Sequence, residues 1–330
     1  MSRNQTAPPS STIDPYEYPQ IVPNHDSTDH HNIAGTSPII TKDVTLNPNH
    51  NTWLRIFLPS QALASTSNKT KMFPLIVYYH GGGFTTSSAA STMNNDFCSN
   101  TVLQLVVAVV SVEYRLAPKH RLPVAYDDAT EAASGNIAYQ VGLRASTAVD
   151  GFKPLKIRGL VLHHPFFGGS QRTESELRLV NNPILPQSVS DLIWKLALPI
   201  GVDRDHEYCN PTVGGGPDHF DQIRKLGWWV LVIGCDGDPL IDHQRELVEI
   251  LNKKGVLVEA QFNKGDYHGV ELMDATKANP LFKFLSHFIK PRFALSRPYY
   301  RRYFKVLLMS LFANYFVIFI YHNSKELLYS

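Results

Sequence analysis

The sequence predicts an α/β fold with a largely parallel central sheet. Short runs of β-branched and aromatic residues recur along the chain and alternate with segments of helical character. The run at residues 105–114, LVVAVVSVEY, is almost continuously apolar, which is typical of a strand that is covered on both faces. Strands that alternate with helices indicate parallel pairing through helical crossovers. At 330 residues, one large domain is favoured over two.

The individual elements follow from local patterns. Strands are expected at residues 43–46, 53–58, 75–79, 105–114, 158–163, 228–233 and 256–262. The first two alternate apolar and polar side chains around Pro48-Asn49-His50-Asn51, which predicts a β-hairpin. Helices are expected at residues 95–103, 189–198, 242–254 and 280–289, and the third carries Leu247, Ile250 and Leu251 at helical spacing.

The chain divides into three regions, and the second contains an insertion. Residues 1–40 are rich in Asn, His, Ser, Thr and Pro and predict an irregular arm that folds over a pocket. Residues 41–290 form the predicted core domain, in which residues 170–225 are long enough to cap one end of the sheet. Residues 291–330 form a tail. Its apolar run at 306–321 follows basic residues and predicts either a membrane-associated segment or an incidental or buried helix, because it is short for a span.

Charge and cysteine content narrow the class of protein. The net charge of +2 is small and spread along the chain, which argues against a nucleic-acid partner. Cys98, Cys209 and Cys235 are odd in number and lack Cys-x-x-Cys spacing, so a reduced, cytoplasmic protein is expected. The polar N-terminus has no apolar signal core. The tail is the segment of the sequence that argues for a membrane, and no motif specifies an oligomeric state.

A glycine-rich loop carries the strongest chemical signal. His80-Gly81-Gly82-Gly83-Phe84 directly follows the predicted strand at 75–79. Three glycines let the backbone turn tightly and bring its N–H groups close to a ligand. Such donors stabilise the negative oxygen that forms when an ester is attacked. We therefore predict an oxyanion hole at Gly81, Gly82 and Gly83, with His80 as part of the motif.

Two further polar residues follow predicted strands in the order expected of an acid and a base. Asp238 lies just past the strand at 228–233, and His268 lies just past the strand at 256–262. Carboxyl ends of parallel strands are where ligands bind in α/β sheets. His268 is predicted to carry protons and Asp238 to fix its tautomer. Asp236 competes for the acid role, as does Asp242, although a helix cap is the better interpretation of Asp242.

Together these motifs give a specific resemblance. The matching segments are residues 14–18 (DPYEY), 42–47 (KDVTLN), 80–84 (HGGGF), 113–118 (EYRLAP), 122–123 (LP), 126–128 (YDD), 238–240 (DPL) and 268–269 (HG). From about residue 14 to residue 290 the chain resembles plant-type carboxylesterases of the hormone-sensitive-lipase family of α/β-hydrolases. The resemblance implies an α/β-hydrolase fold with a helical cap, hydrolysis of small esters, and oxyanion donors from Gly81 and Gly82. It also implies that no metal and no organic cofactor takes part.

The chain departs from the family at one place. The family carries Gly-x-Ser-x-Gly on a strand-to-helix turn between motifs that match residues 126–128 and 158–163, and no such motif or strand is present here. Ser134 is the nearest substitute, but it lacks the flanking glycines and continues a helical period through residues 129–141. Ser87 and Ser88 follow the oxyanion loop and also lack the elbow. One central strand, the nucleophile strand, is therefore predicted to be missing.

Three hypotheses follow for the function. The chain is an esterase-family hydrolase, impaired or inactive as written; or a non-catalytic binding protein, as the gibberellin receptors of the same family are; or a mis-spliced product of an active esterase gene. His163 and His164 are interpreted as structural rather than as metal ligands, because strand neighbours point to opposite faces.

Overall fold

The chain enters the sheet through the predicted hairpin. Strand β1 (Ile39–Asn47) pairs antiparallel with β2 (Thr52–Pro59), and their side chains alternate across the ladder.

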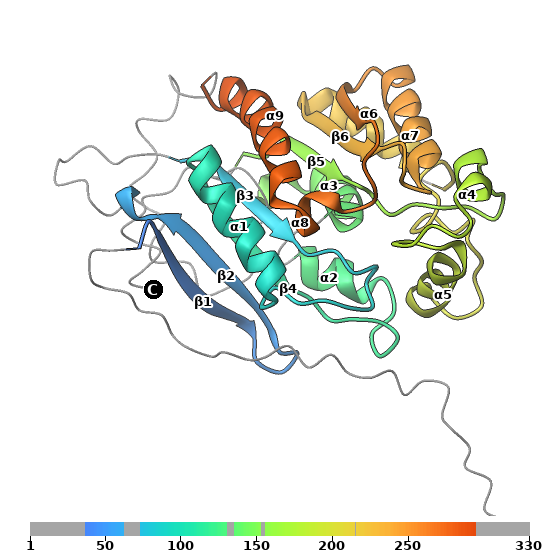
Figure 1. Cartoon of the computed structure of the whole chain (residues 1–330), viewed down its shortest axis with the longest axis horizontal. Coiled ribbons are helices and arrows are strands. Elements are labelled where there is room, and N and C mark those ends of the chain that lie inside the picture. Colours follow the sequence, from blue (N-terminus) through green and yellow to red (C-terminus); the bar gives the residue numbers. More distant parts are fainter. Residues whose placement is uncertain (1–36, 63–72, 131–134, 153–155, 215, 295–330) are drawn as a thin grey trace, which may run out of the picture.

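The computed structural model describes residues 37–62, 73–130, 135–152, 156–214 and 216–294 (Figure 1). Ser134, the apolar run at 306–321 and most of the predicted arm at 1–40 lie outside these ranges.

The described strands form two sheets. The remaining strands are β3 (Leu75–Tyr79), β4 (Ala108–Glu113), β5 (Gly159–His163), β6 (Trp229–Cys235) and β7 (Leu257–Asn263). The first sheet has the order β1-β2-β4-β3 and the second has the order β5-β6-β7. Pairing is parallel from β4 to β3 and throughout the second sheet. Within the described residues no strand pairing joins β3 to β5, and we call the space between them the seam.

Helices cover both faces of the strands. They are α1 (Thr92–Leu105), α2 (Val124–Thr130), α3 (Gly135–Thr147), α4 (Glu174–Arg178), α5 (Gln187–Ala197), α6 (Gly216–Leu226), α7 (Ile241–Lys253), α8 (Val270–Met273) and α9 (Ala275–Ala294), with 3₁₀ turns at Ser60–Ala62 and Val149–Phe152. Figure 1 shows α1 and α9 on one face of the strands, where Phe97 and Phe282 are in contact.

The core has two parts because each strand presents alternate side chains to the two faces. In β6, Val230 and Val232 belong to the cluster beneath α3 and α7, whereas Leu231 and Ile233 belong to the cluster beneath α1 and α9. Strand β6 is thus buried on both sides, as expected of a parallel strand between helical layers.

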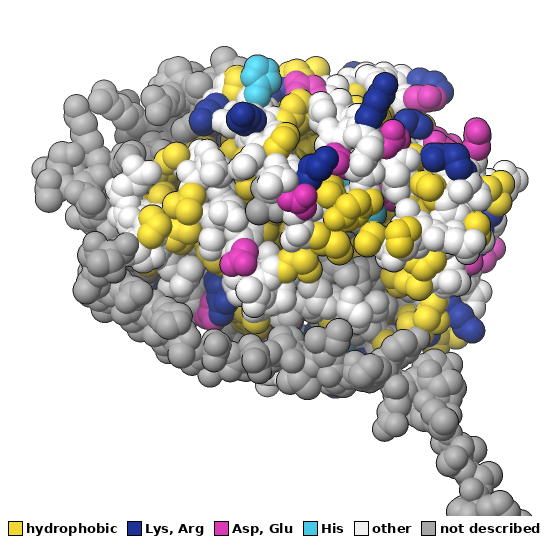
Figure 2. All heavy atoms as spheres, in the orientation of Figure 1, with side chains coloured by type: hydrophobic (Ala, Val, Ile, Leu, Met, Phe, Trp, Pro, Cys, Tyr) yellow, Lys and Arg dark blue, Asp and Glu magenta, His cyan; other side chains and the backbone are white. Residues whose placement is uncertain are grey.

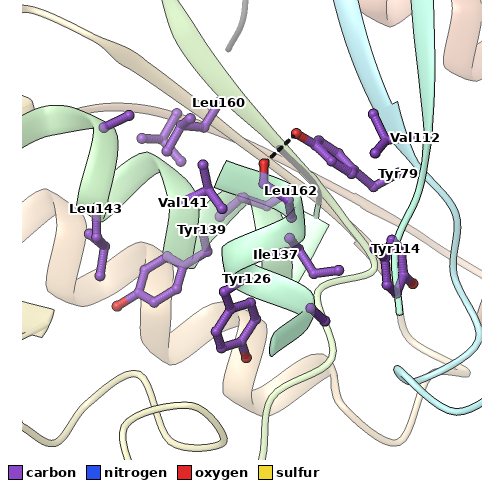
Figure 3. Packing of buried hydrophobic residues seen from close by; sticks show 14 of the residues in the cluster. Tyr79, Val112, Tyr114, Tyr126, Ile137, Tyr139, Val141, Leu143, Leu160 and Leu162 are labelled. Atoms are coloured by element: carbon purple, nitrogen blue, oxygen red, sulfur yellow. Dashed lines mark hydrogen bonds between the residues drawn. The ribbon is translucent and has the colours of Figure 1, made fainter. Parts of the chain in front are cut away.

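Helix α3 bridges the seam. It contacts both β3 and β5. Figure 3 shows Val141 of α3 close to Leu160 and Leu162 of β5, while Tyr79 of β3 lies nearby and its hydroxyl donates to the carbonyl of Ala129 (3.1 Å). Side-chain packing, rather than a strand ladder, therefore connects the two sheets.

Two boundaries expected from the sequence are wrong. The strand predicted at 105–114 begins only at Ala108, because Leu105 completes α1 and Val106 ends it with a left-handed φ of 58°. The single helix expected through residues 129–141 is instead two helices, α2 and α3. The Tyr126 hydroxyl donates to Asn136 Oδ1 over 3.1 Å, whereas ten residues of one straight helix would separate them by about 15 Å.

The distribution of surface charge and the state of the cysteines agree with the expectations from composition. Figure 2 shows acidic and basic side chains interspersed on one face, without a patch of one sign. All three cysteines are buried and unpaired. Within the described residues, none of the helices combines the length and the apolar character that a membrane crossing needs.

The motif residues Arg115, which is half-buried, and Asp128, which is buried, form an ion pair that ties the loop after β4 to α2. Asp128 is 3% exposed and accepts from the Arg115 backbone N–H (3.0 Å) and from its guanidinium (2.7 Å). We expect Asp128→Asn to lower the free energy of unfolding by about 3 kcal/mol, because asparagine leaves part of the guanidinium unsatisfied.

The neighbouring Asp127 supplies the matched control. Its side chain is 59% exposed and pairs with Arg144 on the surface, so Asp127→Asn should cost less than about 1 kcal/mol. Urea unfolding followed by circular dichroism measures both variants. Equal losses in the two variants would contradict the structural role of Asp128.

Candidate active site

The glycine loop directly follows β3 and requires glycine at two of its positions. Gly82 and Gly83 have φ values of 107° and 59°, in the region that side chains disfavour. A Cβ on Gly82 would lie 2.1 Å from the Thr86 carbonyl oxygen, and one on Gly83 would lie 2.8 Å from Ile193 Cγ2 of α5. Space around Gly81 is open. The loop is therefore packed between the backbone of Thr86, where the chain turns back, and Ile193 of α5.

His80 supports this loop from below. It is 2% exposed, and its ring stacks on Tyr114 with 4.3 Å between centroids. The Tyr114 hydroxyl donates to the His80 carbonyl (2.9 Å). Burial lowers the pKa of His80 to about 4, so the ring is neutral at physiological pH. A neutral, stacked ring fixes the entry to the loop without adding a charge.

The structure brings the predicted acid and base together. Asp238 follows β6, is fully buried, and accepts a hydrogen bond from His268 Nδ1 over 2.8 Å. Burial by itself would raise the pKa of Asp238, but His268 and His164 outweigh that effect and hold it well below its usual range. Asp238 is thus a carboxylate that fixes the Nδ1–H tautomer of His268 and leaves Nε2 free for a proton.

The two competing carboxylates have other partners. Asp236 accepts from the Gly265 N–H (2.8 Å) and Asp242 accepts from the Ser175 N–H (2.8 Å). Asp242 lies in the first turn of α7 but does not provide the capping bond, so the helix-cap interpretation is wrong. Among the three, Asp238 is the carboxylate bonded to His268.

A second histidine that the sequence analysis left as structural also binds Asp238. His164 Nδ1 lies 3.1 Å from Asp238 Oδ2. Burial alone would lower the pKa of His164. Its contacts with Asp238 and Glu271 outweigh burial and raise the pKa to about 9. His163 and His164 both approach Glu271, at 3.2 and 3.3 Å from Oε2.

The prediction that these two rings point to opposite faces is therefore wrong. His164 lies one residue past β5 with a φ of 43°, so it no longer follows the alternation of the strand. Glu271, three residues after His268 in α8, was not predicted, because a single glutamate in a short helix gives no periodic signal.

A cavity of about 410 Å³ occupies the seam. Its walls come from β3 and β5, from α1 and α9 on one face, and from α3 on the other. The glycine loop and His268 provide its polar end, while Val189 and Ile193 of α5 contribute an apolar wall. This arrangement suits a small ligand with an apolar body and one polar group near the loop.

The serines near the glycine loop have partners outside this site. Ser87 Oγ accepts from Asn94 (3.0 Å), and Ser88 Oγ donates to Glu113 (2.9 Å). Within the described part of the chain, no serine lines the cavity and no hydroxyl is hydrogen-bonded to the His268 ring. Ser134 lies outside the described residues.

Comparison with a protein-family model described as "alpha/beta hydrolase fold" gives a match over residues 76–135 and 131–272. The chain belongs to the α/β-hydrolase family. The first matched segment contains the glycine loop, and the second contains Asp238 and His268. The two segments meet at residues 131–135, where the sequence lacks the expected elbow.

Curated relatives place the chain among the plant carboxylesterases. Carboxylesterase 20 of Arabidopsis thaliana is 42% identical, and the match covers 85% of this chain and 98% of the relative. The 3-O-acetylpapaveroxine carboxylesterase CXE1 of Papaver somniferum is 39% identical, over 84% of this chain and 97% of that protein. The gibberellin receptor GID1B of Arabidopsis thaliana is 34% identical, over 64% of this chain and 66% of the receptor.

The alignment with Carboxylesterase 20 contains gaps on the side of this chain. It runs over 320 residues, whereas 85% of 330 residues is about 280, which leaves about 40 positions without a residue here. That difference is close to the size of one compact βαβ unit, which is roughly 30 residues or more.

Solved structures show the same fold. An esterase from Pyrobaculum calidifontis matches with a TM-score of 0.63 at 22% identity, covering 76% of this chain and 85% of that one. Carboxyl esterase 2 of Tuber melanosporum matches with a TM-score of 0.63 at 19% identity, covering 78% and 88%. The predicted α/β-hydrolase fold is confirmed.

The glycine loop gives a first test of the site geometry. Gly82→Ala should destabilise the protein by about 2–3 kcal/mol, because it combines a disfavoured φ with a contact against backbone. Gly81→Ala is the matched control and should change stability by less than about 1 kcal/mol, since its Cβ meets open space. Urea unfolding of both proteins checks the difference, and equal costs would refute the loop conformation.

The buried ring of His80 predicts a pH dependence. Between pH 6.5 and 4 the unfolded chain takes up a proton at this histidine that the folded protein does not. Stability should therefore fall as pH falls, with a contribution from His80 of about 3 kcal/mol near pH 4. His80→Gln lacks this contribution, so its urea midpoint should fall less over the same range. Parallel curves for the two proteins would contradict the prediction.

Proposed function

We propose that this protein is a carboxylesterase-type hydrolase that still binds small esters but, as written, turns them over very slowly or not at all. The observation that carries the proposal is the site itself. The glycine loop and the Asp238–His268 pair, joined over 2.8 Å, border a 410 Å³ cavity, and within the described residues no serine faces it.

The role of each residue follows from the chemistry of acyl transfer. The N–H groups of Gly81 and Gly82 are proposed to bind the carbonyl oxygen and its developing negative charge. Nε2 of His268 is proposed to accept the proton of the attacking group, and the Asp238 carboxylate to stabilise the resulting imidazolium. Within the described residues, the attacking oxygen and the oxyanion N–H that would follow it on the elbow have no source.

The catalytic cost of lacking a nucleophile determines the level of activity that we expect. Removing the nucleophile from a serine hydrolase costs about a million-fold in turnover, because nucleophile, base and acid act as a unit. The elbow also supplies one of the oxyanion N–H groups, worth about 3 kcal/mol when it is removed alone. Residual catalysis by the loop and by His268 would be small beside that of a complete enzyme.

Three observations support the proposal that a segment carrying the nucleophile is missing. The family match breaks at residues 131–135, and about 40 positions of the 42% identical relative lack a residue in this chain. Strands β3 and β5 lie on either side of a cavity and share no strand pairing in the described residues. A parallel strand followed by a helix would account for all three.

Two alternatives belong to this proposal. A binding protein without turnover is favoured by the mainly apolar cavity and by the related gibberellin receptor. A mis-spliced product of an active esterase gene is favoured by the abrupt junction of the two matched segments. A cytoplasmic location, supported by the three unpaired cysteines, remains part of the proposal.

Two assays test the proposal directly. Purified protein should show no hydrolysis of p-nitrophenyl acetate above that of His268→Ala, and no covalent labelling by a fluorophosphonate probe, which requires an activated serine. Robust turnover that disappears in His268→Ala, together with labelling at Ser134 or another serine, would show that a nucleophile is present.

A gain-of-function experiment separates the alternatives. Residues 131–134 are replaced by the elbow segment of the Arabidopsis relative, and the same replacement with its elbow serine changed to alanine is the control. Recovery of labelling and turnover only with the serine, and loss of turnover in Asp238→Asn, would show that the rest of the esterase site is intact. A folded but inactive chimera would favour the binding protein.

A further inference from the structure

Beside the acid–base pair lies a second group of converging side chains. The Nε2 atoms of His163 and His164 and a carboxylate oxygen of Glu271 all lie within 4.8 Å of one another. Glu271 Oε2 is 3.2 Å from His163 Nε2 and 3.3 Å from His164 Nε2. The side chains of Glu271 and His164 are only 2% and 4% exposed. Three ligand-type atoms thus meet at one buried point.

These atoms have no hydrogen-bond partner in the described structure. The two Nε2 atoms and both Glu271 carboxylate oxygens are buried without one, because their approach has the distance of a hydrogen bond but not its direction. Buried polar atoms are nearly always satisfied. Four such atoms around one point form a place that an occupant able to bind lone pairs would satisfy.

The neighbouring hydrogen bond fixes which atoms of His164 are free. Its Nδ1–H donates to Asp238 Oδ2 over 3.1 Å, which directs Nε2 toward the cluster. Histidines that bind metal ions commonly donate their other N–H to a carboxylate, which orients the ring and raises its basicity. Asp238 stands in that relation to His164.

The spacing fits a tetrahedral ion. Ligand atoms at about 2.0–2.1 Å from a zinc ion stand about 3.3–3.4 Å apart around a tetrahedron. The two observed separations, 3.2 and 3.3 Å, are close to this value. Two imidazoles and one carboxylate form a ligand set typical of zinc, and the nitrogen donors disfavour magnesium and calcium.

The charges of the buried carboxylates also favour a bound cation. Asp238 and Glu271 are two buried carboxylates, and no Lys or Arg of the described residues forms an ion pair with either. Buried charges are normally paired or bound to a metal. A divalent cation would balance both carboxylates and would take the place of the proton that His164 Nε2 holds toward Glu271 in the metal-free protein.

We propose that His163, His164 and Glu271 form a binding site for a divalent transition-metal ion of the zinc type, with Asp238 orienting His164. His163 and His164 also line the cavity, so the fourth coordination position is accessible to water or ligand from that side. The proposal does not depend on esterase activity, since it rests on side chains other than the base and the glycine loop.

Metal binding by the metal-free full chain tests the site directly. Cobalt(II) is the probe, because four-coordinate cobalt absorbs visible light far more strongly than the hydrated ion, and calorimetry with zinc gives the stoichiometry. One equivalent per chain, with an intense visible spectrum that zinc displaces, is the expected result. Absence of stoichiometric binding by the wild-type chain would overturn the proposal without recourse to any variant.

Substitutions then separate the site from surface histidines. Glu271→Gln and His163→Asn should abolish the intense spectrum, and Asp238→Asn should weaken zinc binding by about 10–100-fold. His287→Gln, at an exposed position of α9, is the matched control and should bind as the wild type does. Unchanged binding in folded Glu271→Gln and His163→Asn would assign the metal to the surface and overturn the proposal.

Discussion

The buried carboxylate of Asp238 is the constraint on which the site depends. It accepts hydrogen bonds from His268 Nδ1 (2.8 Å), His164 Nδ1 (3.1 Å), Gln244 Nε2 (3.0 Å) and the Leu240 N–H (2.9 Å). These donors come from the loop after β7, the end of β5, helix α7 and the loop after β6. Because an ion without partners could not remain at zero exposure, all four segments must meet for the fold to close.

The seam determines what the rest of the site can do. Strands β3 and β5 carry the glycine loop and the histidine pair at their carboxyl ends, so the cavity between them joins both chemical groups. Helices α1, α3 and α9 keep the two sheets together by side-chain packing. The cavity thus lies where the glycine loop, the histidine pair and His268 converge between two sheets that share no strand pairing in the described residues.

Most of the fold was predictable because buried strands appear in the sequence as apolar runs that end at turn residues. Residues 75–79 match β3 because their apolar run ends at the glycines. At 105–114 the same rule failed, since apolar side chains continue from α1 into β4 and conceal the end of the helix at Val106. The pairing of Asp238 with His268 followed from strand order, but the positive φ of His164 and its approach to Glu271 leave no sequence signal.

The division of the strands into two hydrogen-bonded ladders also affects how the protein should unfold. Backbone hydrogen bonds run from strand to strand within each ladder, and this continuity stops between β3 and β5 in the described residues. Both hydrophobic clusters nevertheless contain side chains of the two sheets, so the halves share their cores. The union of the halves should therefore weaken together with apolar packing, before either ladder of hydrogen bonds is lost.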